Sequence, residues 1–253
     1  MSSLEPDWGI LSGSKGALWY DSLMKLLLTS GGITNDTLVR ELEQLAGKPF
    51  AKLKIGFIPS AAFGDPNDDK SWFIKDLYRL VERGATVAVI SLADLLPEEI
   101  AAQLEPVDVI LMGGGQTFYL SWLMQQKGLF DLLPKLLETK VYAGISAGSM
   151  IMTPSLRTVS FAIRKPDASD KELELLGPEG RSSVHTLGLV NFLIRPHMNG
   201  NQKFSDITLD MVQNVANKTG IRAYMLDDDC AVRVVGGDVS VVGEGKWNIV
   251  EPK

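Results

Sequence analysis

The chain has 253 residues, of which 45% are hydrophobic and 22% charged, and its formal net charge is −6. This composition indicates a folded globular domain with a large core, and the acidic balance argues against a surface for nucleic acid or anionic membranes. The single cysteine, Cys230, excludes an internal disulfide and a multi-cysteine metal site, which is typical of a reducing compartment, so we expect a cytoplasmic protein.

Residues 1–23 differ in composition from the rest of the chain. Aromatic residues stand there among Gly and Ser, without a basic start or a continuous apolar block, so we predict neither a secretory signal nor a membrane span. We interpret this segment as an upstream extension or an expression remnant, with a dimer-contacting arm as a further alternative. Residues 24–253 are then expected to form a single α/β domain.

From Met24 onward, apolar strands alternate with amphipathic helices. The first strand ends at Gly31-Gly32, and Asn35 is expected to cap the next helix. Because the strands are separated by helical stretches, the connections must be crossovers, which predicts a mostly parallel sheet with helices on both faces. Ligands bind at the carboxyl ends of strands in such sheets. The expected strands in this part are 25–30, 54–58, 85–90 and 108–112.

Two glycine-rich turns follow neighbouring strands. Residues 113–120 (GGGQTFYL) lead into a helix, and residues 141–150 (VYAGISAGSM) contain the pattern G-x-S-x-G around Ser146. A strand that turns sharply on such a serine and restarts as a helix is typical of a nucleophile elbow, which exposes the hydroxyl at the sheet rim. The N–H of Ala147 would then point to where an oxyanion forms, with a second donor from the 113–115 turn. The alternative is an ordinary loop between two elements.

A serine nucleophile needs a base, and the chain has only two histidines. Residues 188–194 are expected to form a strand, and His197 follows it on a loop, the usual place for a catalytic side chain. A lone histidine is more often structural, but its combination with the elbow favours function. His185 precedes the same strand, so we expect it at the opposite end in a structural role.

Residues 204–242 are interpreted as structure only. A helix is expected over 209–216, with the chain entering it from Phe204, and residues 234–242 indicate a hairpin. The run Asp227-Asp228-Asp229 suggests a metal cluster, but adjacent residues point to alternate faces and no histidine is near in sequence. We therefore expect a solvated turn before a strand at 231–235.

Three motifs in this order, GGGQTFYL, GISAGS and LGLVNFLIRPH, resemble the peptidase E family of serine peptidases, which includes aspartyl dipeptidase and cyanophycinase. The resemblance covers roughly residues 24–200. It implies a fold similar to class I glutamine amidotransferases, with Ser146 as nucleophile, His197 as general base, and Gly114, Gly115 and Ala147 around the oxyanion.

The chain departs from the family pattern at two places. Gln116 stands where the family usually has Asn. The family's acid follows the elbow by fifteen to eighteen residues, but no carboxylate lies in residues 160–164 of this chain. We expect Asp167 to orient His197, since any carboxylate that reaches the distal ring nitrogen would serve. The other candidates, which equally suit a solvated loop, are Asp170, Glu172, Glu174 and Glu179.

The sequence thus predicts covalent acyl transfer by a serine without a metal or organic cofactor, and the resemblance implies that the enzyme is an exopeptidase. The resemblance implies short peptides with N-terminal aspartate as substrates, or β-aspartyl material as in cyanophycinase. Gln116 and Arg195 are expected to contact substrate, with Arg157 and Arg164 as other cations for its carboxylate. The alternatives are another serine hydrolase of this fold and an inactive pseudopeptidase that acts as a binding module. We expect a monomer or homodimer.

Overall fold

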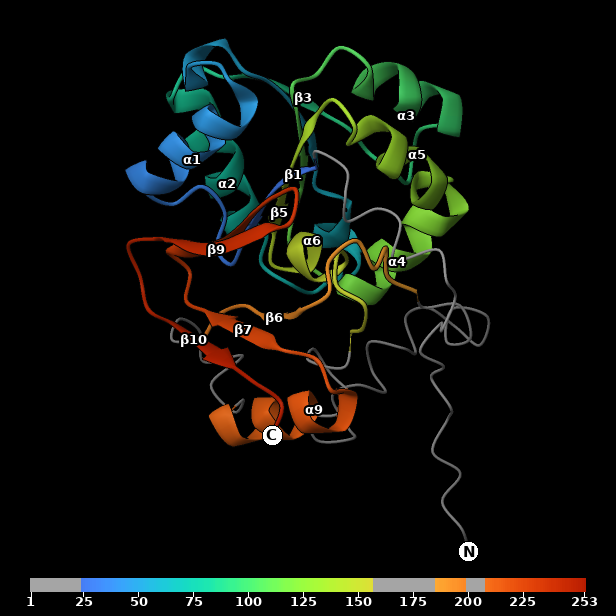
Figure 1. Cartoon of the computed structure of the whole chain (residues 1–253). Coiled ribbons are helices and arrows are strands. Elements are labelled where there is room, and N and C mark those ends of the chain that lie inside the picture. The colour runs from blue at the N-terminus through green and yellow to red at the C-terminus, as the bar shows by residue number, and fades with distance from the viewer. Residues whose placement is uncertain (1–23, 157–184, 199–207) are drawn as a thin grey trace, which may run out of the picture.

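The computed structural model describes residues 24–156, 185–198 and 208–253 (Figure 1). Its strands form two sheets, one of seven strands and one of three. The larger sheet lies between layers of helices, and the smaller sheet lies beside it with helix α9 on its outer side (Figure 1). The predicted N-terminal extension, residues 1–23, lies outside the described residues.

The large sheet has the order β3-β2-β4-β5-β1-β8-β9. The first five strands in this order pair in parallel. Strands β8 and β9 form an antiparallel hairpin, and β8 also pairs antiparallel with β1. The predicted mostly parallel sheet and the C-terminal hairpin are confirmed. The strands are β1 (Lys25–Thr29), β2 (Lys54–Ile58), β3 (Thr86–Val89), β4 (Val109–Met112), β5 (Val141–Ile145), β8 (Cys230–Val235) and β9 (Asp238–Gly243).

Alternation along the buried strands divides the core into two layers. Leu26 and Leu28 of β1 face the layer formed with α3, α4 and α5, whereas Leu27 faces the layer formed with α1 and α2. Within the described residues, no helix is long and apolar enough to cross a bilayer. The helical elements are α1 (Asp36–Ala46), η2 (Phe50–Lys52), η3 (Ser60–Phe63), α2 (Ser71–Glu82), α3 (Pro97–Leu104), α4 (Thr117–Gln126), α5 (Leu129–Leu136) and α6 (Ala147–Met150).

Local sequence signals set the ends of α1. The Asn35 side chain accepts a hydrogen bond from the N–H of Leu38 (3.0 Å), which is the predicted cap. Gly47 ends the helix with a φ of 67°, a left-handed conformation that glycine adopts without a Cβ penalty. The helix therefore starts directly after the loop that carries Gly31 and Gly32, which fixes the path of the chain beyond β1.

The small sheet has the order β10-β7-β6, with β6 (Leu193–Arg195) parallel to β7 (Ala223–Leu226) and β10 (Trp247–Val250) antiparallel to it. Helix α9 (Leu209–Thr219) packs on this sheet through Val212, Val215 and Ala216. The helix was expected at 209–216, and Phe204 lies outside the described residues.

The expected strand at 188–194 needs correction. Only residues 193–195 belong to a strand, and they lie in the small sheet. The preceding residues run along the end of α6 instead, because Leu187 and Val190 donate backbone hydrogen bonds to the carbonyls of Ile151 and Met152. His197 therefore follows a strand of the small sheet and not one of the large sheet.

Candidate active site

Ser146 sits on a tight turn between β5 and α6, as the elbow pattern predicts. Its φ of 48° and ψ of −103° lie in a region that few non-glycine residues occupy. Both glycines of the pattern are required by close packing. A Cβ on Gly144 would lie 2.6 Å from the N of Ser149, and one on Gly148 would overlap the carbonyl oxygen of Met112.

Hydrogen bonds to the end of β1 hold this turn in place. The N–H of Ser146 donates to the carbonyl oxygen of Thr29 (3.1 Å), and the Ser149 hydroxyl donates to the same oxygen (2.7 Å). The Thr29 hydroxyl in turn donates to the carbonyl of Gly144 (2.7 Å). The strained residue is therefore fixed by neighbours on both sides of the turn.

The glycine turn after β4 lies against the elbow. A Cβ on Gly114 would be 3.5 Å from the Ser146 Cβ, so this backbone runs directly beside the serine. Gly115 has a φ of 131°, and a Cβ there would overlap the carbonyl of Ala61. Ala147 is the first residue of α6, where backbone N–H groups have no partner within the helix. The arrangement brings the three residues expected around an oxyanion to one rim of the sheet.

His197 reaches this rim from the end of β6. Its Nε2 lies 2.8 Å from the Ser146 Oγ, although the two residues follow strands of different sheets. The backbone of His197 has a φ of 60°, in the left-handed region. The predicted pairing of Ser146 with His197 is thus present in the geometry. The backbone of His185 bonds to Ser121 instead: its N–H donates to the Ser121 hydroxyl (3.1 Å), which donates to its carbonyl oxygen (2.7 Å).

The carboxylate at the distal nitrogen of His197 is Asp228, a residue expected from the sequence to lie in a solvated turn. Its Oδ1 lies 2.5 Å from the His197 Nδ1. That interpretation of Asp228 is wrong, because the turn at 227–229 follows β7, whose carboxyl end lies beside that of β6. The residue expected there, Asp167, lies outside the described residues, as do Asp170, Glu172, Glu174 and Glu179.

The missed signal was a four-residue apolar run, Ala223–Leu226, that ends just before the acidic turn. The turn itself is built by Asp227, whose carboxylate accepts the N–H groups of Asp229 (3.1 Å) and Lys246 (2.5 Å). Asp228 stands between Asp227 and Asp229 in this turn, and its carboxylate lies against the His197 ring.

Electrostatics at Asp228 favour its ionised form. Partial burial raises the pKa of this carboxyl, but hydrogen bonds from His197 and Ser30 and electrostatic attraction to His197 and Arg79 outweigh that effect, so the pKa lies below its ordinary value. A carboxylate can only accept, so the Nδ1 of His197 carries the proton that it donates. The Nε2 of a neutral ring is then free to accept the Ser146 hydroxyl proton.

The residues expected to contact substrate are less accessible than the sequence suggests. The Gln116 side-chain oxygen accepts the N–H of Tyr119 and so caps α4. Arg195 is 3% exposed on β6, which leaves little of its guanidinium open to a ligand. Their roles toward substrate stay predictions. Arg157 and Arg164 lie outside the described residues.

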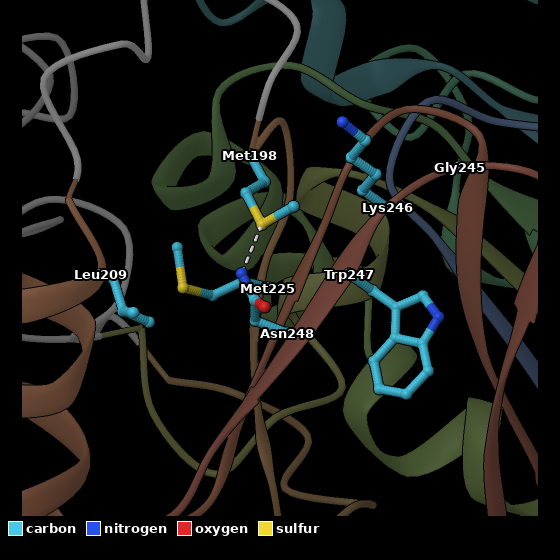
Figure 2. Close-up of a pocket in the computed structure, with 7 residues that line it drawn as sticks. All are labelled: Met198, Leu209, Met225, Gly245, Lys246, Trp247 and Asn248. Atoms are coloured by element: carbon cyan, nitrogen blue, oxygen red, sulfur yellow. Dashed lines mark hydrogen bonds between the residues drawn. The ribbon is translucent and has the colours of Figure 1, made fainter.

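A pocket of about 590 Å³ opens beside Met198, the residue after His197. Figure 2 shows Met198, Asn248 and Met225 close together, with the Asn248 amide donating to the Met198 sulfur (3.3 Å) and the Trp247 ring pointing away from them. The pocket is lined by apolar side chains together with Lys246 and Asn248 and by polar backbone groups, and its lining includes neither Ser146 nor His197. The pocket therefore adjoins the site without supplying a reactive group to it.

Within the described ranges, no group of three His, Cys, Asp or Glu side chains is placed to hold a metal ion. The one cysteine is buried, and desolvation and the neighbouring Asp227 raise the pKa of its thiol to about 12. A thiol with that pKa is a poor nucleophile at neutral pH. The reactive groups brought together in the described structure are thus Ser146, His197 and Asp228.

Comparison with known proteins relates the chain to peptidases. The model of peptidase family S51 matches residues 26–242. An uncharacterized peptidase of Listeria monocytogenes is 28% identical over 220 residues, which cover 86% of this chain and 97% of that protein. A peptidase E of Streptomyces coelicolor is 34% identical over 97 residues, 38% of this chain and 34% of that protein.

Solved structures with the same fold are also found among peptidases. A putative peptidase E of Listeria monocytogenes superposes with a TM-score of 0.69 at 25% identity, over 88% of this chain and 99% of that chain. A peptidase from an acI-B1 actinobacterium gives a TM-score of 0.62 at 19% identity and covers 93% of each chain, which shows the common fold.

Proposed function

The chain belongs to peptidase family S51 and is a serine peptidase, and from this premise we propose that it is an exopeptidase in which Ser146, His197 and Asp228 act together on short peptides. The observation that carries this proposal is the continuous path from the Ser146 Oγ through His197 to Asp228, with separations of 2.8 and 2.5 Å. Each distance is within hydrogen-bond reach, so a proton can pass from the serine to the imidazole.

The chemistry follows from these contacts. His197 takes the hydroxyl proton through Nε2 while Ser146 attacks the scissile carbonyl carbon, and Asp228 stabilises the imidazolium that forms. The N–H of Ala147 and the Gly114–Gly115 backbone stabilise the negative oxygen of the tetrahedral intermediate. His197 then gives its proton to the leaving amine, and water hydrolyses the acyl-enzyme by the same route in reverse.

Asp228 also bears on the alternatives. An inactive binding module was an alternative because no carboxylate stood at the family's usual position. Asp228 supplies that carboxylate from a different part of the chain, so this reason no longer holds. A cyanophycinase-like hydrolase of β-linked aspartyl material remains the second candidate, since it would use the same three side chains.

For substrate we propose short peptides with a free N-terminal aspartate, a preference that family resemblance supports. The test compares Asp-Leu and Asp-Ala-Ala with their N-acetylated forms and with a β-aspartyl-linked polymer. We expect the free peptides to be cleaved far faster than the acetylated ones. Equal rates on both, or cleavage of the polymer alone, would contradict the proposed substrate class.

The nucleophile is tested in the same assay. Ser146→Ala should lower kcat by about 10⁴-fold or more, because it removes the attacking atom. Thr153→Ala is a matched control, since it also removes a buried hydroxyl from the segment after β5, one that donates to the backbone carbonyls of Met150 and Ser155. Near-normal turnover of pure Ser146→Ala would contradict the assignment.

A further inference from the structure

Ser30 lies one residue beyond the end of β1 and is fully buried. Its hydroxyl is hydrogen-bonded to both His197 and Asp228, the two residues proposed to act with Ser146. The Oγ accepts the backbone N–H of His197 (2.8 Å) and donates to the Oδ1 of Asp228 (3.0 Å). A single hydroxyl therefore links the backbone of the proposed base to the carboxylate of the proposed acid.

These bonds close a ring with the imidazole. The same Oδ1 that accepts from Ser30 also lies 2.5 Å from the His197 Nδ1. The Ser30 Oγ thus holds the backbone of His197 and the Asp228 Oδ1 holds its ring, and these two oxygens are hydrogen-bonded to each other. Its left-handed φ of 60° needs such support, because a residue with a Cβ adopts that conformation at a cost in energy.

The chain around Ser30 is built for close approach to Asp228. A Cβ on Gly31 would lie 2.7 Å from the Asp228 Cβ, so only glycine allows this contact. The Thr34 hydroxyl donates to the backbone carbonyl of Asp228 (3.2 Å). The segment after β1 therefore packs directly against the turn that contains Asp228.

We propose that Ser30 is a positioning residue that sets the orientation of both His197 and Asp228, and so fixes the Nδ1–H form of the imidazole. The inference rests on the proposed function for its effect on catalysis. Its structural content, one hydroxyl that orders two side chains from the small sheet against the large sheet, can be measured without any substrate.

The experiment combines kinetics with NMR of the imidazole. Ser30→Ala removes the shared hydroxyl, and we expect kcat to fall about 10- to 100-fold, as for misplacement of a reacting group by about 1 Å, while KM stays unchanged. The chain has only His185 and His197, so ¹⁵N-labelled imidazoles give two resolvable sets of signals, and His185→Gln assigns them. The Nδ1–H signal of His197, present in the parent, should broaden or vanish in Ser30→Ala.

Two further variants keep the test decisive. Ser30→Cys keeps an unbranched side chain that fills the site with a larger sulfur atom, but it offers only a weak donor and acceptor, so it should show the same changes even where Ser30→Ala folds poorly. Thr153→Ala removes a hydroxyl that is also buried and that donates to the backbone carbonyls of Met150 and Ser155. It should retain the Nδ1–H signal of the parent.

The two readouts separate the inference from the proposed function. An unchanged Nδ1–H signal in folded Ser30→Ala overturns the inference, whatever happens to turnover. If the parent cleaves no peptide but the signal is lost in Ser30→Ala, the proposed function fails and the positioning role of Ser30 stands. A rise in KM with unchanged kcat would place Ser30 in substrate binding and would also overturn the inference.

Discussion

Asp228 receives hydrogen bonds from two directions, one from the His197 ring and one from the Ser30 hydroxyl. Its side chain is still 41% exposed, whereas that of His197 is 17% exposed. A carboxylate in this place orients the ring more than it packs a core. Replacing it should therefore change catalysis far more than stability.

We predict that Asp228→Asn lowers kcat by about 10⁴-fold, because the amide can donate to Nδ1 and so stabilise the wrong tautomer. The measurement is kcat on the peptide that proves best. Asp229→Asn is the matched control, since Asp229 is exposed and adjacent in the same turn, and it should keep kcat near that of the parent.

Asp167→Asn decides between the two carboxylates. If Asp228 is the acid, Asp167→Asn should leave kcat near that of the parent. A large drop in Asp167→Asn together with normal turnover of Asp228→Asn would restore the expectation drawn from the sequence and remove Asp228 from the mechanism.

The candidate site shows which residues a linear pattern can predict. Ser146 and the glycines around it are adjacent in sequence and follow one turn geometry, so the pattern predicts them directly. His197 could be predicted from its place after an apolar run. Asp228 could not, because its approach to His197 depends on the parallel pairing of β6 with β7, two strands of three and four residues that are separate in sequence.

At the scale of elements, the strands and crossover helices of the large sheet were predictable because apolar runs alternate with amphipathic stretches. The small sheet was not, because β6 has only three residues and three of the four residues of β10 are exposed, so neither strand gives a clear apolar run. Residues 188–192 look like a strand by composition, but their backbone bonds go to the end of α6. Pairing partners, which decide such cases, are not local in sequence.

The elbow gives a prediction for the β5–α6 junction. Gly148→Ala should destabilise the protein by about 2–4 kcal/mol, because its Cβ would overlap the Met112 carbonyl and force the two elements apart. The measurement is the free energy of unfolding in urea. Gly237→Ala, in the β8–β9 turn with nothing within 4 Å of its Cβ, should stay within about 0.5 kcal/mol of the parent. Equal effects of the two changes would contradict the packing argument.

Helix α2 gives a prediction about pH. Asp76 on this helix is 8% exposed, and burial raises the pKa of its carboxyl to about 7 despite an ion pair with Arg79 (2.9 Å). The folded state therefore binds this proton more tightly than the unfolded state. The resulting stabilisation is complete below about pH 4 and is lost as the pH rises through about 7.

We predict that Asp76→Asn flattens this pH dependence. The difference in unfolding free energy between pH 4 and pH 8 should shrink by at most about 4 kcal/mol, the full linkage value for the shift. Urea titrations at both pH values measure it. Asp36→Asn is the control for the loss of a surface charge, since it changes a carboxylate in α1 that is 80% exposed and lies 3.6 Å from Arg83. A parent whose stability does not fall between pH 4 and pH 8 relative to Asp76→Asn would contradict the assignment.

At the scale of the whole molecule, the proposed reactive groups come from two sheets. Ser146 follows β5 of the large sheet, whereas His197 and Asp228 follow β6 and β7 of the small sheet. Ile194, Tyr224 and Leu226 of the small sheet join the main core, and the other side of that sheet has a separate core with α9. The 2.8 Å contact between Ser146 and His197 thus depends on how firmly the small sheet is held between these two cores.

This division predicts that two equally buried valines differ in their effect on catalysis. Val212→Ala loosens the α9 core behind the strands that carry His197 and Asp228, and Val109→Ala makes a similar cavity at the start of β4. Each should cost about 1–3 kcal/mol of stability, but only Val212→Ala should also lower kcat, by roughly tenfold, because a small displacement of the base is expensive. The test compares the melting temperatures of the two variants and their kcat values, with kcat measured well below both melting temperatures. Equal kcat values would mean that the small sheet keeps His197 in place without the support of α9.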